Sequence, residues 1–466
     1  MNSEKLNKAL KFIDSFLKLR YEKNNWPGFV VAISHKGKIV FNNAYGYANL
    51  ERKEKLTKDH VFRIASHSKT FTATAIMQLV EQKRLRLDDC VAQYLPWLGE
   101  HKDKRFKKIT IKQLLSHGSG IIRDGLDANY WQMGRSFPDT EQLKEEMLEA
   151  NLVMNPNTQM KYSNVGFSLL GLVIAEVSGM SYHDYINKNM IEPLGLKNTG
   201  SELDLKIINR VTGYSRRNKH NVRLPIEDID TRGMSSATGF YSTSEDLCEY
   251  FNAQMIGSGK LLSDGSKKLM QKAEWKVKNN LAKVKYGLGF EICPIGEHEL
   301  FGHPGGFPGQ ITMTLCDPKK ELVVTVLTNC IDGMADFKAK GIFSILYYFE
   351  KNYHLNFKND LSKFEGRFMD LWGAENVVSM GDRLVSVYLD AFTPFNNPQE
   401  LEYINSNTLK IVKADGFYAE GELVHYNFGE KGEIKSVEFG GATMLPEKEY
   451  LAKTENLTEI KLQRSR

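Results

Sequence analysis

The sequence pattern changes near residue 352, and this change most constrains the fold. Before it, strand-like and helix-like runs are mixed without regular βα alternation, which predicts an α+β domain. After it come short β-prone runs that are evenly punctuated by turn residues, which predicts a small all-β barrel or sandwich. We therefore predict two domains, residues 1–355 and residues 356–466.

Hydrophobic periodicity locates the main elements of the first domain. Two β-prone runs flank His35-Lys36-Gly37 and predict a hairpin, and an apolar run before Gly179 predicts a helix that ends there. The predicted elements are strands over 29–34, 38–45, 310–316 and 321–328, helices over 69–84, 165–178 and 334–350, and a helix that begins near Thr243.

Composition and the N-terminal segment restrict partners and location. A formal net charge of +5 over 466 residues does not favour nucleic acid. No apolar run approaches the ~20 residues of a membrane span, and the N-terminus lacks the features of a secretory signal. Leu6, Leu10, Ile13 and Leu17 instead predict an amphipathic helix that packs on a domain surface, with membrane attachment as the alternative.

The cysteines and histidines exclude two further classes of site. The five cysteines are odd in number and widely spaced without a CxxC pair, which argues against a disulfide framework or a zinc site. The histidines form no HExxH pattern, so no metal is expected. The cysteine pattern favours a reducing compartment, and we predict a cytoplasmic protein.

The segment Ser66-His67-Ser68-Lys69 is the first candidate for chemistry. It places a hydroxyl and an amine one helical turn apart, about 5–6 Å between Cβ atoms. A lysine in a partly dry site has a lowered pKa and can act as a base toward the serine. Ser15-Phe16-Leu17-Lys18 matches the same pattern, and we interpret its polar residues as part of a solvated helix face.

Two later motifs support this candidate. Tyr162-Ser163-Asn164 stands just before a predicted helix, and its phenol can shuttle protons if a neighbouring cation acidifies it. His303-Pro304-Gly305-Gly306 stands before a predicted strand, where glycines let backbone N–H groups approach a substrate as an oxyanion hole requires.

The three motifs in this order resemble those of the serine β-lactamase/penicillin-binding-protein superfamily. The class C-like branch, with its CubicO-type hydrolases, D-aminopeptidases and family VIII esterases, is the most similar, over about residues 25–350. The resemblance implies a β-lactamase/transpeptidase-like α+β domain, which consists of an antiparallel sheet with flanking helices and a helical subdomain. It also implies that this domain needs no cofactor. Residues 364–368 open a segment that weakly resembles an appended lipocalin-like barrel. The further matching segments are 62–65, 114–120, 193–196 and 239–243.

The resemblance also implies roles for residues of the three motifs. Ser66 is the acylated nucleophile, and Lys69 and Tyr162 share the work of general base and proton shuttle. Asn164 orients the lysine or the substrate amide. The backbone N–H groups of Ser66 and Gly306, next to Gly305, form the oxyanion hole.

His303 departs from the pattern of the penicillin-recognising members. It takes the place of the lysine in their K-T-G element, and a neutral histidine attracts a carboxylate less strongly. We therefore predict a serine hydrolase that cleaves an amide or ester bond in a small-molecule or short-peptide substrate, with D-residues as one substrate class. The alternatives are a weakly active penicillin-binding protein or β-lactamase, and a non-catalytic scaffold of the same fold. The resemblance also leaves open a homo-oligomer formed through the C-terminal domain.

Four further residues near the motifs have weaker interpretations. Tyr130 and Trp131 fall in the loop-like stretch 121–138, where the family builds a wall of its cleft, so substrate contact and ordinary packing both remain open. His117 and His67 are interpreted as structural, because S-x-x-K chemistry needs no histidine base.

Overall fold

Contacts divide the chain into two compact units. The computed structural model describes residues 2–204, 206–280, 282–354, 360–389, 391–455 and 457. We name residues 24–339 the sheet unit, and residues 1–23 with 340–466 the barrel unit. The predicted boundary between residues 355 and 356 lies outside the described residues. The division instead falls inside helix α11 (Ala335–Asn352), so most of this helix and α1 (Ser3–Asn24) group with the barrel.

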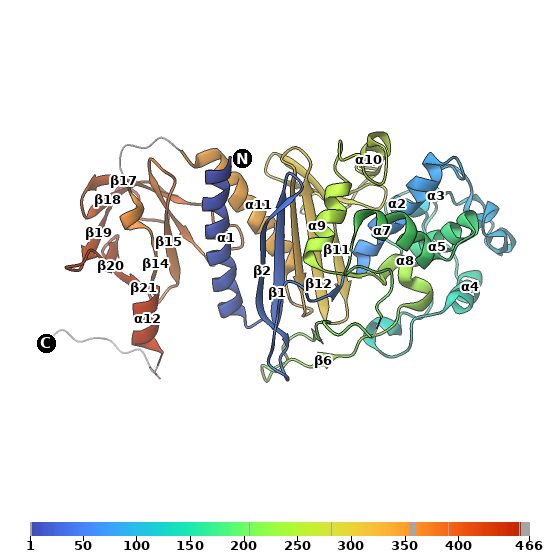
Figure 1. Ribbon diagram of the computed structural model, residues 1–466, viewed down its shortest axis with the longest axis horizontal. Helices are drawn as coiled ribbons and strands as arrows, with labels where there is room; N and C mark the ends of the chain where they lie inside the picture. The colour runs from blue at the N-terminus through green and yellow to red at the C-terminus, as the bar shows by residue number, and fades with distance from the viewer. Residues whose placement is uncertain are drawn as a thin grey trace. The chain divides into compact units, whose positions relative to one another are not determined.

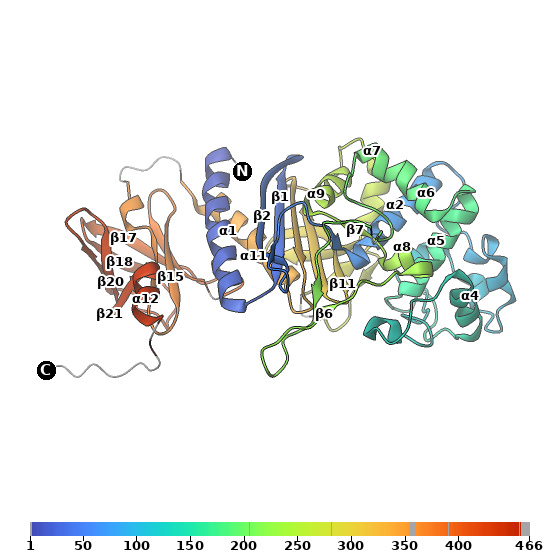
Figure 2. The same cartoon turned by 60° about the horizontal axis from the view of Figure 1, so that its bottom comes forward.

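An antiparallel sheet forms the centre of the sheet unit. Its order in the described chain is β3-β2-β1-β13-β12-β11-β10-β9-β8 (Figures 1 and 2). β1 (Gly28–His35) and β2 (Lys38–Asn49) form the predicted hairpin, and Lys36 and Gly37 both have positive φ at its turn. β1 also pairs with β13 (Leu322–Thr328), which joins the two ends of this unit. The other strands are β3 (Glu54–Lys55), β8 (Trp275–Lys276), β9 (Lys285–Tyr286), β10 (Glu291–Ile295), β11 (His298–Phe307) and β12 (Gln310–Asp317).

The helices from α2 to α10, all in the sheet unit, gather on one side of this sheet in both views (Figures 1 and 2). α2 (Ser68–Glu81) and α5 (Asn164–Ser178) match two predicted helices, and α5 ends at Gly179 with φ 71°. α9 (Ser244–Ala253) begins at the predicted cap, where the Thr243 side chain accepts from the Asp246 N–H. The remaining helices are α3 (Ile111–Leu115), α4 (Thr140–Glu149), α6 (Tyr182–Ile186), α7 (Glu192–Leu194), α8 (Ser235–Thr238) and α10 (Asp264–Met270).

Within the described residues of this unit, two pairs of short strands lie outside the central sheet. β4 (Phe62–Arg63) pairs with β7 (Tyr241–Ser242), and β5 (Gly213–Tyr214) pairs with β6 (Pro225–Ile226).

One continuous core fixes the two helices that carry the predicted motifs. Val30 of β1, Phe71 of α2 and Leu169 of α5 are fully buried in the same apolar cluster. Phe71 stacks on Tyr250 of α9, with ring centroids 3.7 Å apart. Because α2 and α5 are held along most of their length, their N-terminal ends have little freedom to move.

The barrel unit contains a closed antiparallel barrel, as the sequence predicts. The eight described strands follow chain order from β14 to β21, and β14 closes the barrel by pairing with β21. Phe364, Val377, Leu401 and Tyr426 lie in its apolar core. The strands are β14 (Gly366–Met369), β15 (Ala374–Ser379), β16 (Leu384–Tyr388), β17 (Gln399–Asn405), β18 (Thr408–Lys413), β19 (Leu423–Phe428), β20 (Ile434–Phe439) and β21 (Ala442–Pro446), and helix α12 (Glu447–Thr454) follows them.

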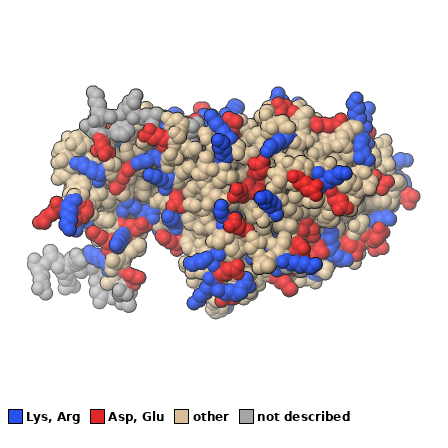
Figure 3. Space-filling model, in the orientation of Figure 1, with Lys and Arg blue, Asp and Glu red and all other residues tan. Residues whose placement is uncertain are grey.

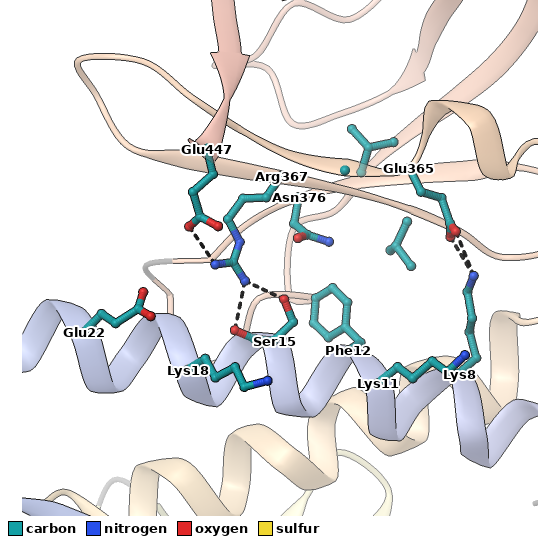
Figure 4. A pocket seen from close by; sticks show the side chains of 13 residues that line it. Lys8, Lys11, Phe12, Ser15, Lys18, Glu22, Glu365, Arg367, Asn376 and Glu447 are labelled. Carbon is teal, nitrogen blue, oxygen red and sulfur yellow. Dashed lines mark hydrogen bonds and ion pairs between the residues drawn. The ribbon is translucent and has the colours of Figure 1, made fainter. Parts of the chain in front are cut away.

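Helix α1 packs within the barrel unit. The Phe12 ring lies 5.8 Å from the ring of Phe349 in α11. Arg367 of β14 donates to the backbone and side-chain oxygens of Ser15, at 2.9 and 2.5 Å, and pairs with Glu447 at 2.8 Å (Figure 4). Leu6, Ile13 and Leu17 are buried and Leu10 is half-buried, which supports packing as the role of this helix. Ser15, from the second S-x-x-K match, is therefore a structural contact.

Surface charge and helix hydropathy do not point to a nucleic acid or membrane partner. Basic and acidic side chains are interspersed on the face shown in Figure 3. Among the described residues, no single helix is long and apolar enough to cross a membrane, although α5 and residues 182–194, bent by 80°, pass a length-and-composition test together.

Candidate active site

Ser66 lies in a tight turn at the start of α2. The 3₁₀ helix η1 (Ala65–His67) leads directly into α2, and Ser66 is half-buried in a turn whose neighbouring residues are buried. Ala65 has φ 47°, a left-handed conformation that costs an alanine roughly 1–2 kcal/mol. The turn therefore presents the serine hydroxyl while its backbone is held by packing. Backbone N–H groups in a first helical turn have no partner inside the helix, so they are available to a ligand.

Lys69 is fully buried and points at Ser66. Its Nζ lies 3.2 Å from Ser66 Oγ, 2.7 Å from Asn164 Oδ1 and 2.8 Å from the Ala237 carbonyl oxygen. Burial lowers the pKa of Lys69 well below its ordinary value, although the negative charge of Asp124 opposes this shift. The side chain is thus positioned, and shifted toward the neutral amine, for accepting a proton from the serine.

Tyr162 and Asn164 are positioned by the cap of α5. The Ser163 side chain accepts from the Gly166 N–H at 2.9 Å and donates to the Ile122 carbonyl at 2.8 Å. This cap fixes the residues on either side of it, and Tyr162 OH lies 3.0 Å from Ser66 Oγ. Burial raises the pKa of Tyr162, and the nearby Arg123 only partly offsets this effect. The structure therefore differs from the expectation of an acidified phenol, and Tyr162 is a neutral proton donor.

Asp124 is a site residue that the sequence interpretation missed. Its Oδ1 accepts from Asn164 Nδ2 at 2.5 Å and from Trp131 Nε1 at 3.0 Å. Since Asn164 thereby donates to Asp124, its carbonyl oxygen is oriented toward Lys69. No motif marks this aspartate, and only the fold brings residue 124 beside the start of α5.

Strand β11 approaches the nucleophile turn at the predicted glycines. A Cβ on Gly305 would lie 2.3 Å from the Ile64 carbonyl oxygen and 2.2 Å from Thr312 Oγ1, so only glycine fits there. Gly306 is exposed, and strand β11 contacts η1. Ser66, Gly305 and Gly306 therefore lie together, although they are about 240 residues apart in sequence.

His303 is buried and has both ring nitrogens engaged. Nδ1 lies 2.7 Å from the Pro304 carbonyl oxygen and must donate to it, so Nε2 accepts from Tyr286 OH at 2.9 Å. Burial and the nearby Lys69 lower the pKa of His303 well below its ordinary value. The ring is neutral and has no free N–H, so it positions its surroundings and offers no charge to a substrate. Tyr286, which the sequence interpretation also missed, fixes its tautomer.

Two other histidines support the site through packing. His117 Nδ1 accepts from the Ser163 N–H at 3.2 Å, and its ring lies 4.1 Å from the ring of Tyr162. His67 is bonded to the Ile64 carbonyl oxygen and to Thr314 Oγ1, both at 3.0 Å, and burial lowers its pKa to about 4. Both contact patterns agree with the predicted structural roles.

Tyr130 and Trp131 lie in the 3₁₀ helix η5 (Asn129–Gln132). Tyr130 is fully buried in an apolar cluster with Ala65, Phe137 and Phe307, and its hydroxyl bonds to the Asp124 carbonyl. Packing is therefore the role that this geometry gives Tyr130. Trp131 is half-buried and remains the member of the pair that can meet a substrate.

The site shows nothing that would hold a metal ion. Within the described part of the chain, no group of three or more His, Cys, Asp or Glu side chains is arranged for metal binding. What the arrangement can do is acyl transfer, since a hydroxyl, a buried amine and a phenol converge on one point beside the first turn of α2 and the exposed Gly306.

Comparisons with known proteins agree with the geometry. Protein flp of Staphylococcus aureus (strain MW2) is 28% identical over 330 residues, which cover 69% of this chain and 64% of that protein, less than two thirds of its length. The octameric penicillin-binding protein homologue from Pyrococcus abyssi is 25% identical, with a TM-score of 0.65, over 93% of this chain and 99% of that chain. A D-stereospecific amidohydrolase from Streptomyces sp. is similar in fold, with 23% identity and a TM-score of 0.61, over 71% of this chain and 97% of that chain. The Beta-lactamase family model matches residues 13–346. The chain therefore belongs to the β-lactamase family, within the serine β-lactamase/penicillin-binding-protein superfamily that its three motifs resemble.

Proposed function

We propose that the protein is a serine hydrolase that cleaves an amide or ester bond through an acyl-enzyme on Ser66. One observation carries the proposal: Ser66 Oγ lies 3.2 Å from a fully buried amine and 3.0 Å from a phenol. A buried lysine with a lowered pKa is the base that a serine hydroxyl requires when no histidine reaches it.

We propose an order of proton transfers that uses the contacts of Ser66 with Lys69 and Tyr162. Neutral Lys69 takes the Ser66 proton as Oγ bonds to the substrate carbonyl carbon, and the carbonyl electrons move onto its oxygen. The N–H groups of Ser66 and Gly306 stabilise that oxyanion. When the bond to the leaving group breaks, Tyr162 gives that group its proton and is reprotonated from Lys69. Lys69 then takes a proton from the water that attacks the acyl carbon, and it returns this proton to Ser66 Oγ as the acyl–oxygen bond breaks, which releases the acid and regenerates Ser66.

The substrate class follows from the charges around the serine. His303 is neutral and enclosed, so the site lacks a cation where the penicillin-recognising members have lysine. We place small esters and short peptides, including those with D-residues, ahead of β-lactams. The structural similarity to a D-stereospecific amidohydrolase supports that order.

Arg123 is an exposed cation beside Tyr162, and it pairs with Asp124 at 3.2 Å. Its guanidinium lies 5.7 Å from the centre of the Tyr162 ring. We expect it to favour substrates with an anionic substituent, so Arg123→Ala should raise KM about threefold to tenfold for those substrates and leave neutral ones unchanged. Equal effects on both classes, measured with matched ester pairs, would remove Arg123 from substrate recognition.

The test of the proposal is intact-mass spectrometry after exposure to a fluorophosphonate and, separately, to a penicillin. We expect one fluorophosphonate adduct, its loss in Ser66→Ala, and its retention in Ser15→Ala, the matched serine of the second S-x-x-K. A stable penicilloyl adduct would favour penicillin-binding chemistry. A folded protein that gains no adduct from either probe would favour the scaffold alternative.

We also propose that the protein self-associates through the barrel unit. The octameric homologue covers 93% of this chain, which includes residues of the barrel unit. Light scattering during gel filtration should show a mass well above 53.1 kDa for the full chain. A protein that is monomeric at all concentrations would refute self-association, and this result would not bear on the proposed hydrolase chemistry.

The cytoplasm remains the proposed location. In the described chain all five cysteines are free thiols, and four of them are buried. Free thiols are typical of a reducing compartment. Fractionation of the source cells, with the chain found in a secreted or membrane fraction, would contradict this proposal.

A further inference from the structure

One end of the barrel contains a cavity that its apolar core does not fill. The cavity has a volume of about 190 Å³, smaller than the roughly 300–1,000 Å³ typical of sites for drug-sized ligands. Its lining includes two acidic residues, Asp370 and Glu375, and four aromatic ones, Trp372, Tyr388, Tyr418 and Phe439. All of these residues belong to the barrel unit.

Glu375 is directed into the barrel. Val377, two residues further along β15, belongs to the barrel core, and side chains two apart on a strand share a face. Ser386 of the neighbouring β16 donates to Glu375 Oε2 at 2.6 Å. A carboxylate inside a barrel is costly unless it is paired with a positive charge or protonated.

Among the described residues, no salt bridge is formed by the Glu375 carboxylate, and its Ser386 partner is uncharged. The described residues that line the cavity include no lysine, arginine or histidine. Burial, opposed by the Ser386 hydrogen bond and reinforced by the charge of Asp370, raises the pKa of Glu375 to about 7. The lining therefore supplies no positive charge to Glu375, and a cation that enters the cavity would favour the ionised form of this carboxyl.

Aromatic rings surround the entrance to the same cavity. Trp372 is 85% exposed, which is unusual for the largest apolar side chain, and Tyr388 and Tyr418 are about 40% exposed. The Tyr388 hydroxyl donates to the Trp372 carbonyl at 3.1 Å, which joins the two residues at the rim. Aromatic faces attract organic cations through their quadrupoles, most strongly for tryptophan.

We propose that this cavity binds a small organic ammonium ion, with Glu375 as the counter-charge and Trp372, Tyr388 and Tyr418 as the aromatic contacts. Rings and one inward carboxylate fit an alkylammonium head better than a metal ion, because a metal ion would require several oxygen ligands at short distance. The small volume fits a head group with a short chain. The site belongs to the barrel unit, so the inference stands apart from the proposed hydrolase function.

The test is calorimetric titration of the full chain with choline and with n-butylamine, which distinguish a quaternary from a primary ammonium. The uncharged carbon analogue of choline, with carbon in place of nitrogen, is the control ligand. We expect saturable binding of at least one cation and at least tenfold weaker binding of the neutral analogue. Binding should persist in Ser66→Ala, which separates the cavity from the hydrolase site.

Variants assign the binding to this cavity. Glu375→Gln should weaken the affinity at least about tenfold, and Trp372→Leu about fivefold, which is typical of one cation–π contact. Glu402→Gln, on an exposed position of β17, should leave the affinity within twofold. Trp372→Leu changes an exposed side chain, so it tests the site even if Glu375→Gln does not fold. Absence of saturable binding, equal binding of the neutral analogue, or unchanged affinity in folded Trp372→Leu would each overturn the proposal.

Discussion

Lys69 in the sheet unit and Glu375 in the barrel unit show how burial acts on groups of opposite charge. Burial lowers the pKa of the amine and raises that of the carboxyl, so both are shifted toward their neutral forms. Their surroundings then differ. Lys69 has three fixed oxygen partners, one of which is the serine hydroxyl. Glu375 has one hydroxyl partner and an open, aromatic-lined cavity.

The comparison teaches that desolvation alone does not decide what a buried ionisable group can do. The neutral amine is useful because an acidic proton lies within hydrogen-bond distance of it. The buried carboxyl, in contrast, has an unfilled space beside it where a cation can restore its charge. The atoms next to a buried ionisable group, and the empty volume beside it, thus decide whether the group is suited to act as a base or to bind a ligand.

The largest effect is expected from Lys69→Met, which removes the base and keeps the volume of the side chain. We expect the rate of fluorophosphonate labelling and kcat/KM to fall about 10³–10⁴-fold, since Ser66 loses its proton acceptor. Lys18→Met, from the second S-x-x-K, should leave both unchanged. A Lys69→Met protein that labels at the normal rate would show that burial of this amine has no role in the chemistry.

Tyr162→Phe should have the next largest effect, because it removes the proton donor to the leaving group. We expect kcat/KM to fall about 10²–10³-fold for amides and much less for esters with acidic phenol leaving groups, which depart without protonation. Parallel assays of one acyl group as amide and aryl ester measure the difference. Equal losses for both would instead make Tyr162 a positioning residue. Tyr94→Phe is the control, since Tyr94 bonds only to Asp89 among the contacts described.

Glu375→Gln should change stability in a direction that depends on pH. The pKa of Glu375 is raised in the folded state from its ordinary 4.5 to about 7, so its contribution is fully present below pH 4.5 and is lost as the pH rises through about 7. The variant does not titrate at this position, so its free energy of unfolding should exceed that of the wild type by about 3 kcal/mol at about pH 8 and should not exceed it at about pH 4. Pulse proteolysis of the barrel unit in urea at the two pH values measures this change. If the difference in free energy of unfolding between the wild type and the variant were the same at both pH values, the raised pKa of Glu375 would be refuted.

The smallest effect is expected from Asp124→Asn, which removes a negative charge that raises the pKa of Lys69. Without that charge the protonated amine is less favoured, so the pKa falls further. The acidic limb of kcat/KM against pH should then move to lower pH. Asp127→Asn, which alters a carboxylate paired with Arg135, serves as the control. A shift toward higher pH would mean that another group than Lys69 governs the limb.

Much of the fold was predictable because its signals are local. The hairpin around Lys36, the helix that ends at Gly179 and the cap at Thr243 depend on turn chemistry and side-chain periodicity within a few residues. The short, evenly spaced strands after residue 360 likewise predicted the barrel. The grouping of α1 with the barrel could not be predicted in this way, because it depends on contacts such as Phe12 with Phe349 between distant segments.

The residues of the candidate site also fall into two groups, those marked by a sequence motif and those brought together only by the fold. Ser66, Lys69, Tyr162 and the glycines of β11 were identified by their motifs and their order. Asp124 and Tyr286 carry no motif, and their roles arise only where they meet Asn164 and His303.

The sequence by itself determined which side chains are available for chemistry, since a serine and a lysine one turn apart are fixed by helical geometry. It also determined that an α+β domain is followed by an all-β domain, because hydrophobic periodicity and turn residues are features of short sequence segments. Only the tertiary structure decided the protonation preferences. They depend on how much water and how many charges surround a group, and those quantities are set by segments far away in the chain. The lowered pKa of Lys69, the enclosed His303 and the aromatic-lined cavity beside Glu375 are therefore properties of the folded protein.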